Sequence, residues 1–135
     1  MLTDDEDYFA HEGTVFTTFL QKIEEALTSG YDTRVFADAS HLNQSSRAKV
    51  INKVRQYADE INVIWLRTPL MECYKRNENR TGRARVPKPT IKSMYDSIQE
   101  PSYSEGITTV YIVDGKTQEL KVLELGEDNK ENFVF

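Results

Sequence analysis

Short apolar runs that alternate with amphipathic segments constrain the fold of this chain more than any other feature. The run Ile61 to Leu66 is apolar almost throughout, as is typical of a parallel strand that is covered on both faces. Thr33 to Asp38 and Ile107 to Val113 are predicted to be two further strands. Asp114-Gly115 and the partly alternating residues Leu120 to Leu125 indicate a turn and a fourth, antiparallel strand.

Amphipathic helices are predicted between these strands. Apolar residues recur at helical spacing from Val15 to Leu27, and Gly30 follows where a left-handed residue ends a helix. Asn43 is well placed to cap the next helix. Two more helices are expected, one beginning at Thr68-Pro69 and a short one over Ile91 to Ile98.

The order of these elements predicts an α/β fold, a three-layer sandwich around a mostly parallel sheet. A length of 135 residues suits one hydrophobic core, so residues 1–135 are expected to form a single domain that ends in a tail at about 126–135. No apolar run approaches the roughly 20 residues of a membrane span, and the amino terminus begins with acids. We therefore expect a cytoplasmic protein.

Charge is distributed unevenly along a chain whose formal net charge is -5. That sum argues against a general coat for nucleic acid. Both ends are acidic, whereas residues 75–92 form a basic island. Within it, Thr81 to Pro89 has no apolar period and contains two prolines, so a loop is predicted there.

Asp38 closes the predicted strand Thr33 to Asp38. In an open α/β sheet, ligands bind outside the carboxyl ends of the parallel strands. A carboxylate at that place is expected to be paired, hydrated or bound to a cation. The alternative is that Asp38 hydrogen-bonds backbone amides or caps the turn through Ser40 and His41.

Arg76 and Arg80 are four residues apart, so both are predicted to project from one face of a helix that leads into the basic loop. Together with Arg83 and Arg85 they would suit a phosphate with several oxygens, because each guanidinium can make two charge-assisted bonds. The alternative is a solvated helix face, since Glu72 lies four residues before Arg76. Arg47, near the start of its helix, is a weaker candidate for phosphate binding.

Three stretches taken together resemble a known family. They are "VFADASHLNQSSR", "INVIWLRTPLMECYKRNENRTGRARVP" and "SMYDSIQEPSYSEGITTVYIV". Over about residues 1–113 the chain resembles the P-loop kinases of the polynucleotide 5′-hydroxyl kinase type, a group within the wider kinase and AAA-like ATPase superfamily. The motifs that carry this resemblance are a strand ending in Asp-Ala-Ser/Thr-x-Leu-Asn, an arginine soon after, Arg-Asn-x-x-Arg, and Val-Pro before an amphipathic helix.

The resemblance implies a role for each candidate residue. Asp38 would help to organise the magnesium and phosphate site, acting on the metal through magnesium-bound water. Arg76 and Arg80 would be catalytic arginines of a basic lid at about residues 76–88, where they neutralise charge on the transferring phosphoryl group. Arg83 and Arg85 would extend that lid, and Arg47 would bind phosphate or substrate. The reaction would move the γ-phosphoryl group of ATP to a nucleic-acid 5′-hydroxyl or a similar hydroxyl.

One motif of the family is missing, because the sequence contains no G-x-x-x-x-G-K-[ST]. The resemblance implies that this phosphate cradle and the first core strand lie upstream of a segment like "LTDDEDYF". We therefore expect the later part of such a kinase, inactive alone and without tight binding of ATP or Mg²⁺. Two alternatives stay open: a non-catalytic module that binds anions or nucleic acid, and a structural piece that a partner chain completes.

An incomplete sheet leaves backbone donors of two strands without partners. Three remedies are predicted. The strands Thr33 to Asp38 and Ile61 to Leu66 pair directly, another chain inserts a strand between them, or the chain forms a homodimer across the exposed edge.

Overall fold

The computed structural model describes residues 12–124, which fall into two compact units. Unit 1 contains described residues 12–40 and 49–59, and unit 2 contains residues 41–48 and 60–124. The acidic start of the chain and the tail at about 126–135 lie outside the described residues. The expectation of a single domain stays a prediction.

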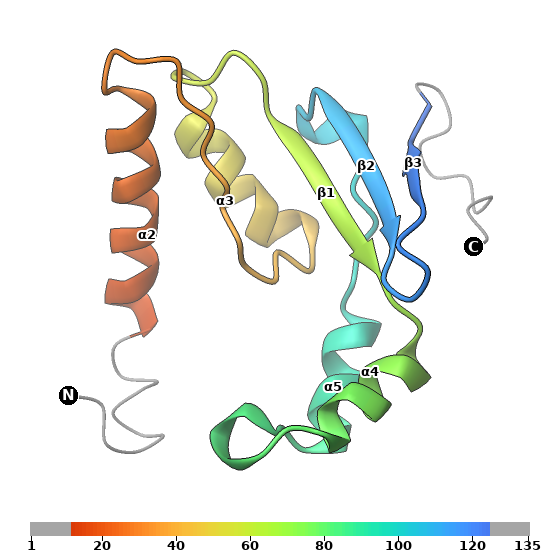
Figure 1. Ribbon diagram of the computed structural model, residues 1–135. Coiled ribbons are helices and arrows are strands. Elements are labelled where there is room, and N and C mark those ends of the chain that lie inside the picture. The colour runs from red at the N-terminus through yellow and green to blue at the C-terminus, as the bar shows by residue number, and fades with distance from the viewer. Residues whose placement is uncertain (1–11, 125–135) are drawn as a thin grey trace. The chain divides into compact units, whose positions relative to one another are not determined.

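Unit 1 contains helix α2 (Glu12–Leu27) and the later part of helix α3 (Gln44–Val54) (Figure 1). Glu24 accepts a hydrogen bond from the Tyr57 hydroxyl at 2.9 Å and pairs with Lys53 at 3.1 Å. Lys53, and after it Tyr57, hold the pKa of Glu24 below its ordinary value. The buried apolar residues of this unit are Ile23, Ile51 and Val54. The helix predicted from Val15 to Leu27 is confirmed, and Gly30 has a φ of 87°, as its place after the helix requires.

The strand predicted over Thr33 to Asp38 is wrong, because residues 31–39 contain no helix and no strand. Phe36 is 79% exposed. Extended backbone is held in a sheet by the hydrogen bonds of a neighbouring strand, and no described strand pairs with this segment. Direct pairing of this segment with Ile61 to Leu66 would join the two units and stays a prediction.

Unit 2 is built on a three-stranded sheet in the order β1 (Asn62–Arg67), β2 (Thr109–Asp114) and β3 (Leu120–Val122) (Figure 1). Strand β1 is parallel to β2, and β3 is antiparallel to β2. The predicted strands at Ile61 to Leu66 and Ile107 to Val113 are thus confirmed, and so is the antiparallel strand after Asp114-Gly115. The sheet is mixed instead of mostly parallel. The three-layer arrangement involves both units and stays a prediction.

The two faces of this sheet differ in exposure. Val110 and Ile112 are almost completely buried, and Val63 and Trp65 lie beside them in the parallel register. Ile64 and Leu66 point to the other face and are 57% and 67% exposed. The expectation that β1 is covered on both faces is therefore wrong for the described residues: only alternate residues of the strand are shielded.

Helices α4 (Leu70–Glu78) and α5 (Lys88–Asp96) lie side by side beyond the carboxyl end of β1 (Figure 1). Short 3-10 turns at η1 (Gly82–Ala84) and η2 (Tyr103–Glu105) complete the unit. Both helices were predicted from Thr68-Pro69 and from the spacing of Ile91 to Ile98. Among residues 12–124, no helix combines the length and the apolar character that crossing a membrane requires.

The turn between β2 and β3 is held by Asp114 and fitted closely to the end of β1. The Asp114 carboxylate accepts hydrogen bonds from the Thr117 and Lys116 amides, and these bonds hold its pKa below the ordinary value. This stabilisation is present above the ordinary aspartate range and is lost as the pH falls through the lowered pKa. Gly115 donates its N–H to the Arg67 carbonyl at 2.7 Å, and a Cβ at Gly115 would collide with the Thr68 side chain. The turn therefore requires glycine because of a close approach.

Gly115→Ala is expected to destabilise unit 2 by about 1 to 3 kcal/mol, since the added methyl group must displace Thr68 or the turn. Urea unfolding followed by fluorescence of Trp65, the single tryptophan, measures the change. Gly13→Ala is the matched control, because nothing lies within 4 Å of a Cβ at Gly13. Equal unfolding midpoints for the two alanine variants would contradict the close fit.

Candidate functional site

The segment before helix α3 is docked onto the segment before strand β2. The Asn43 side chain accepts a hydrogen bond from the Ser46 amide at 2.9 Å, which confirms the predicted cap. The Leu42 carbonyl accepts the Gln99 amide at 2.8 Å, and the Gln44 amide donates to the Gln99 side chain at 2.8 Å. The two bonds made by Gln99 join parts of the chain that are more than fifty residues apart.

A buried ion pair between Arg47 and Glu105 completes this docking. Arg47 Nε lies 2.8 Å from Glu105 Oε1, and Arg47 Nη2 lies 3.2 Å from Oε2, so the pair is bidentate. Arg47 Nη1 donates to the His41 carbonyl at 3.0 Å, and Glu105 Oε2 also accepts the Ser102 amide at 2.8 Å. Both side chains are less than one tenth exposed.

The geometry gives Arg47 a structural role in the protein. Its guanidinium donates to protein oxygens from each of its three nitrogens, and little of it faces solvent. Phosphate binding by Arg47, expected from its place in the sequence, has no support in this arrangement and stays an untested prediction.

Glu105→Gln is expected to lower the free energy of unfolding of unit 2 by about 3 to 5 kcal/mol, because it leaves the Arg47 charge buried without its counter-ion. Urea unfolding followed by Trp65 fluorescence measures the loss. Asp96→Asn is the matched control. It breaks the Lys92–Asp96 pair, whose two side chains are 52% and 55% exposed, and should change stability little. Similar losses in both variants would refute the assignment of Arg47–Glu105 as the anchor.

Arg76 is held at the carboxyl end of the sheet. Its Nε lies 3.2 Å from Glu72, one turn earlier on α4, and its Nη2 donates to the Gly115 carbonyl at 2.5 Å. The side chain is 49% exposed, so part of the guanidinium remains accessible to a ligand. The surface pair with Glu72, which the sequence left open as an alternative, is present.

Arg80 does not lie on the same helix as Arg76. Helix α4 ends at Glu78, and Asn79 is its C-cap, so the expectation that both arginines share one helix face is wrong. The reason is the buried side chain of Asn77, which donates to the Val86 carbonyl at 2.8 Å and accepts the Val86 amide at 3.0 Å. This clamp turns the chain back on itself and places Arg80 in a loop.

The basic lid at residues 76–88 thus combines a backbone that is held by the Asn77–Val86 hydrogen bonds with exposed arginines. Arg80, Arg83 and Arg85 are all exposed. The predicted loop is confirmed from Thr81 to Pro87, with η1 as one short turn inside it, whereas Lys88 and Pro89 belong to the first turn of α5. The exposed guanidiniums of Arg80 and Arg85 on this clamped loop suit a phosphate ligand, because their donors can exchange water for phosphate oxygens.

Asp38 lies in unit 1, in the irregular segment after α2, and is exposed. Among the described residues it makes no hydrogen bond, so neither the capping role nor the bond to backbone amides is seen. His41, close by in the sequence, has a φ of 44°, as a turn residue can. Asp38 and the lid arginines belong to different units, so their convergence on one ligand stays a prediction.

No group of three or more potential metal ligands occurs among residues 12–124. A single exposed carboxylate such as Asp38 suits Mg²⁺, which usually keeps several waters and binds through one or two carboxylates and substrate phosphates. The described residues therefore build no complete metal cage of their own, and a role of Asp38 toward magnesium stays a prediction.

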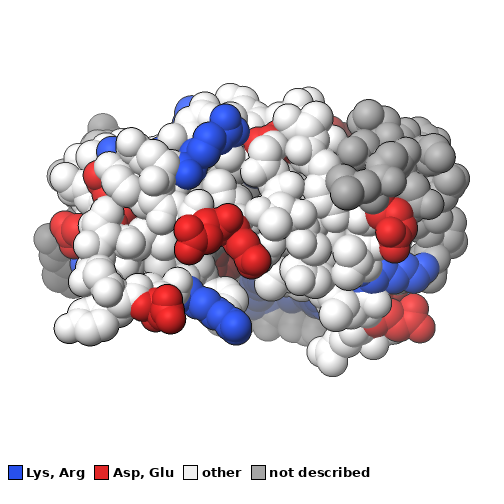
Figure 2. All heavy atoms as spheres, turned by 90° about the horizontal axis from the view of Figure 1, so that it is seen from above, with Lys and Arg blue, Asp and Glu red and all other residues white. Residues whose placement is uncertain are grey.

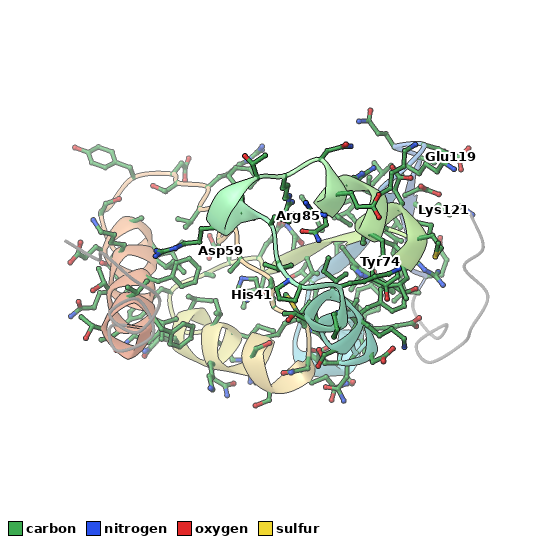
Figure 3. The ribbon with its side chains drawn as sticks, turned by 90° about the horizontal axis from the view of Figure 1, so that it is seen from below. His41, Asp59, Tyr74, Arg85, Glu119 and Lys121 are labelled. Atoms are coloured by element: carbon green, nitrogen blue, oxygen red, sulfur yellow. The ribbon has the colours of Figure 1, made fainter. Side chains whose placement is uncertain are left out.

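The face seen in Figure 2 carries no continuous basic patch among the described residues. Seen from above, the described lysines and arginines lie singly among uncharged and acidic residues (Figure 2). The lid follows α4, which lies at the bottom of Figure 1, and Figure 3 shows Tyr74 on α4 and Arg85 on the loop that follows. In the sequence, the densest cluster of lysines and arginines is residues 75–92, which include the lid.

Sequence reasoning missed three residues that shape the site. Glu105 could have been found, because Ser102-Tyr-Ser-Glu105 has the S-x-x-E spacing of a capping box. Asn77 lies inside the Arg-Asn-x-x-Arg motif, but nothing in the local pattern indicates a bond to Val86. Tyr74 carried no signal beyond its place on an amphipathic helix.

A family model described as an AAA domain matches residues 2–101. The chain belongs to the AAA domain family. Membership supports the resemblance at the level of a P-loop NTPase of the AAA-like group, which includes polynucleotide-kinase-like members, and it implies a fold of that type. It also implies, in general terms, the use of ATP and Mg²⁺. No curated protein and no solved structure matches the chain.

Proposed function

We propose that this AAA domain chain is the later part of a polynucleotide-kinase-like phosphotransferase. The complete enzyme transfers the γ-phosphoryl group of ATP to a 5′-hydroxyl of nucleic acid or a similar hydroxyl. The observation that carries the proposal is the combination of family membership with a clamped lid that presents Arg80 and Arg85 to solvent. Phosphoryl transfer needs positioning and charge neutralisation more than covalent chemistry, and arginines provide both.

The 135 residues alone are proposed to be inactive. Their sequence lacks the G-x-x-x-x-G-K-[ST] loop, whose backbone amides and lysine hold the phosphates in P-loop NTPases. Lid arginines without that cradle bind a triphosphate from one side only. Nucleotide binding is therefore expected to be weak.

Each residue has a proposed part in the complete site. Asp38 would hold, through a bound water, the magnesium ion that accompanies ATP, and that ion would supply neutralisation of phosphate charge. Arg80 contacts the transferring phosphoryl group. Arg76 is already bonded to Glu72 and Gly115 and holds the start of the lid in place. The exposed part of its guanidinium contacts the same phosphoryl group. Arg83 and Arg85 bind the outer phosphates or the acceptor.

A completing strand is part of this proposal. Strand β1 pairs only with β2 among the described strands, and Ile64 and Leu66 are exposed beside that edge. A segment that carries the P-loop, in the same polypeptide or in another chain, would satisfy this edge and cover these side chains. A homodimer across the edge is the alternative.

A second candidate function is a non-catalytic module that binds anions or nucleic acid. The same exposed arginines favour it, together with the missing P-loop. The two candidate functions predict different DNA sequences upstream of the Met1 codon. An in-frame segment upstream of the Met1 codon that encodes a strand and G-x-x-x-x-G-K-[ST] favours the kinase, and its absence together with salt-dependent binding favours the module.

The purified chain is expected to show no transfer of labelled γ-phosphate from MgATP to a 5′-hydroxyl oligonucleotide, and only weak binding of MgATP in an NMR titration. Arg80→Ala should weaken that binding about tenfold, because one charge-assisted bond to phosphate is lost. Robust turnover by pure material would overturn the proposed inactivity.

Arg55→Ala is the matched control for Arg80→Ala. Arg55 is also exposed, lies in unit 1 just past the end of helix α3, and makes no side-chain bond among the described residues. The account requires that Arg55→Ala leaves the MgATP titration unchanged. If both variants weaken binding to the same degree, the effect reflects net charge alone and not a lid contact.

A further inference from the structure

A pocket of about 220 Å³ lies on the lid. We call it the lid pocket, and its lining includes Tyr74, Asn77, Glu78, Arg85, Pro87 and Lys88. It is formed where the end of α4 faces the chain that leads into α5. The roles proposed above for Asp38, Arg76 and Arg80 do not use it.

The backbone at the lid pocket is held in place before any ligand binds. Asn77, 7% exposed, makes two hydrogen bonds to the backbone of Val86, which lies between Arg85 and Pro87. Pro87 and Pro89 restrict the backbone on the following side. A preformed site loses less conformational freedom on binding than a loop that must first fold.

The lining combines an aromatic ring with two cations. The Lys88 ammonium lies 4.6 Å from the centre of the Tyr74 ring. Arg85 makes no side-chain bond among the described residues and is exposed. An aromatic ring on which a base can stack, with cations that follow the phosphate backbone, is the combination by which proteins bind single-stranded nucleic acid. Lys88 is long, exposed and flexible, so it can leave the ring face and meet a phosphate instead.

The carboxylate of Glu78 disfavours a simple anion as the occupant of the lid pocket. Its carboxylate belongs to the same lining and repels a phosphate placed deep in the pocket. A nucleobase with N–H donors can instead offer a hydrogen bond to that carboxylate. The volume also favours one base over a whole nucleotide, because it is below the roughly 300 to 1,000 Å³ of sites that enclose complete small-molecule ligands.

We infer that the lid pocket binds one base of a single-stranded polynucleotide, stacked on Tyr74, with the adjacent phosphate held by Arg85 and Lys88. The inference rests on the proposed function in that the strand is the phosphoryl acceptor. In this arrangement the acceptor strand lies in the lid pocket. Arg85 then contacts the strand, and Arg80, which does not line the pocket, remains available to the triphosphate.

Fluorescence anisotropy with a labelled strand of about eight deoxyadenosines, without ATP, tests the site. Tyr74→Leu is expected to weaken binding about tenfold, and Lys88→Ala several-fold. Tyr74→Phe keeps the ring and should bind like the unaltered chain, which also shows that changes at this position do not simply unfold the lid. An abasic strand of the same length and charge should bind as weakly to the unaltered chain as the deoxyadenosine strand binds to Tyr74→Leu.

Tyr31→Leu is the control for an exposed tyrosine elsewhere, since Tyr31 is 82% exposed in unit 1, and it should have no effect. Equal binding by Tyr74→Leu and the unaltered chain, or by the abasic and the deoxyadenosine strands, would overturn the inference. Those results leave the proposed function standing if Arg80→Ala still weakens MgATP. The opposite combination is also informative. If strand binding depends on Tyr74 but Arg80→Ala binds MgATP normally, the base-binding role of the lid pocket is supported and the proposed kinase function is refuted.

Discussion

The buried pair between Arg47 and Glu105 is the interaction on which the organisation of unit 2 depends. It connects the first turn of α3 to the 3-10 turn that precedes β2, and the same Glu105 carboxylate closes the capping box on Ser102. Two charges out of water are tolerated here because their donors and acceptors are satisfied by protein groups. The segment from His41 to Arg47 therefore has a structural role, because Arg47 holds both the His41 carbonyl and Glu105.

The arginines of the chain divide by what holds them. Arg47 is fully engaged by carboxylate and carbonyl oxygens, Arg76 is partly engaged by Glu72 and Gly115, and Arg80 and Arg85 are exposed. A guanidinium that already has protein partners orients its neighbours, whereas one that is solvated can exchange water for phosphate. Asn77 lies between Arg76 and the exposed arginines. Its hydrogen bonds to Val86 determine where α4 ends and where the loop with the exposed arginines begins.

Local patterns predicted most of the elements, and tertiary contacts account for the failures. Helix α2, the cap at Asn43 and strands β1 and β2 follow from apolar spacing and capping chemistry, which act within one segment. Thr33 to Asp38 has the composition of a strand but no described partner, and a strand is defined by its partner. Likewise, the end of α4 before Arg80 depends on a bond between Asn77 and Val86 that no local pattern reveals. Of the candidate site, the lid was predictable, whereas the engagement of Arg47 required the fold.

The most direct test of the account asks whether Asp38 and Arg80 meet the same nucleotide. Addition of ATP with Mn²⁺ in place of Mg²⁺ to the isotope-labelled chain broadens the NMR signals of residues near the bound metal, even when binding is weak. We expect broadening at both Asp38 and Arg80, with the signals of Arg55 unaffected. Broadening at one of the two without the other, or at neither, would contradict it.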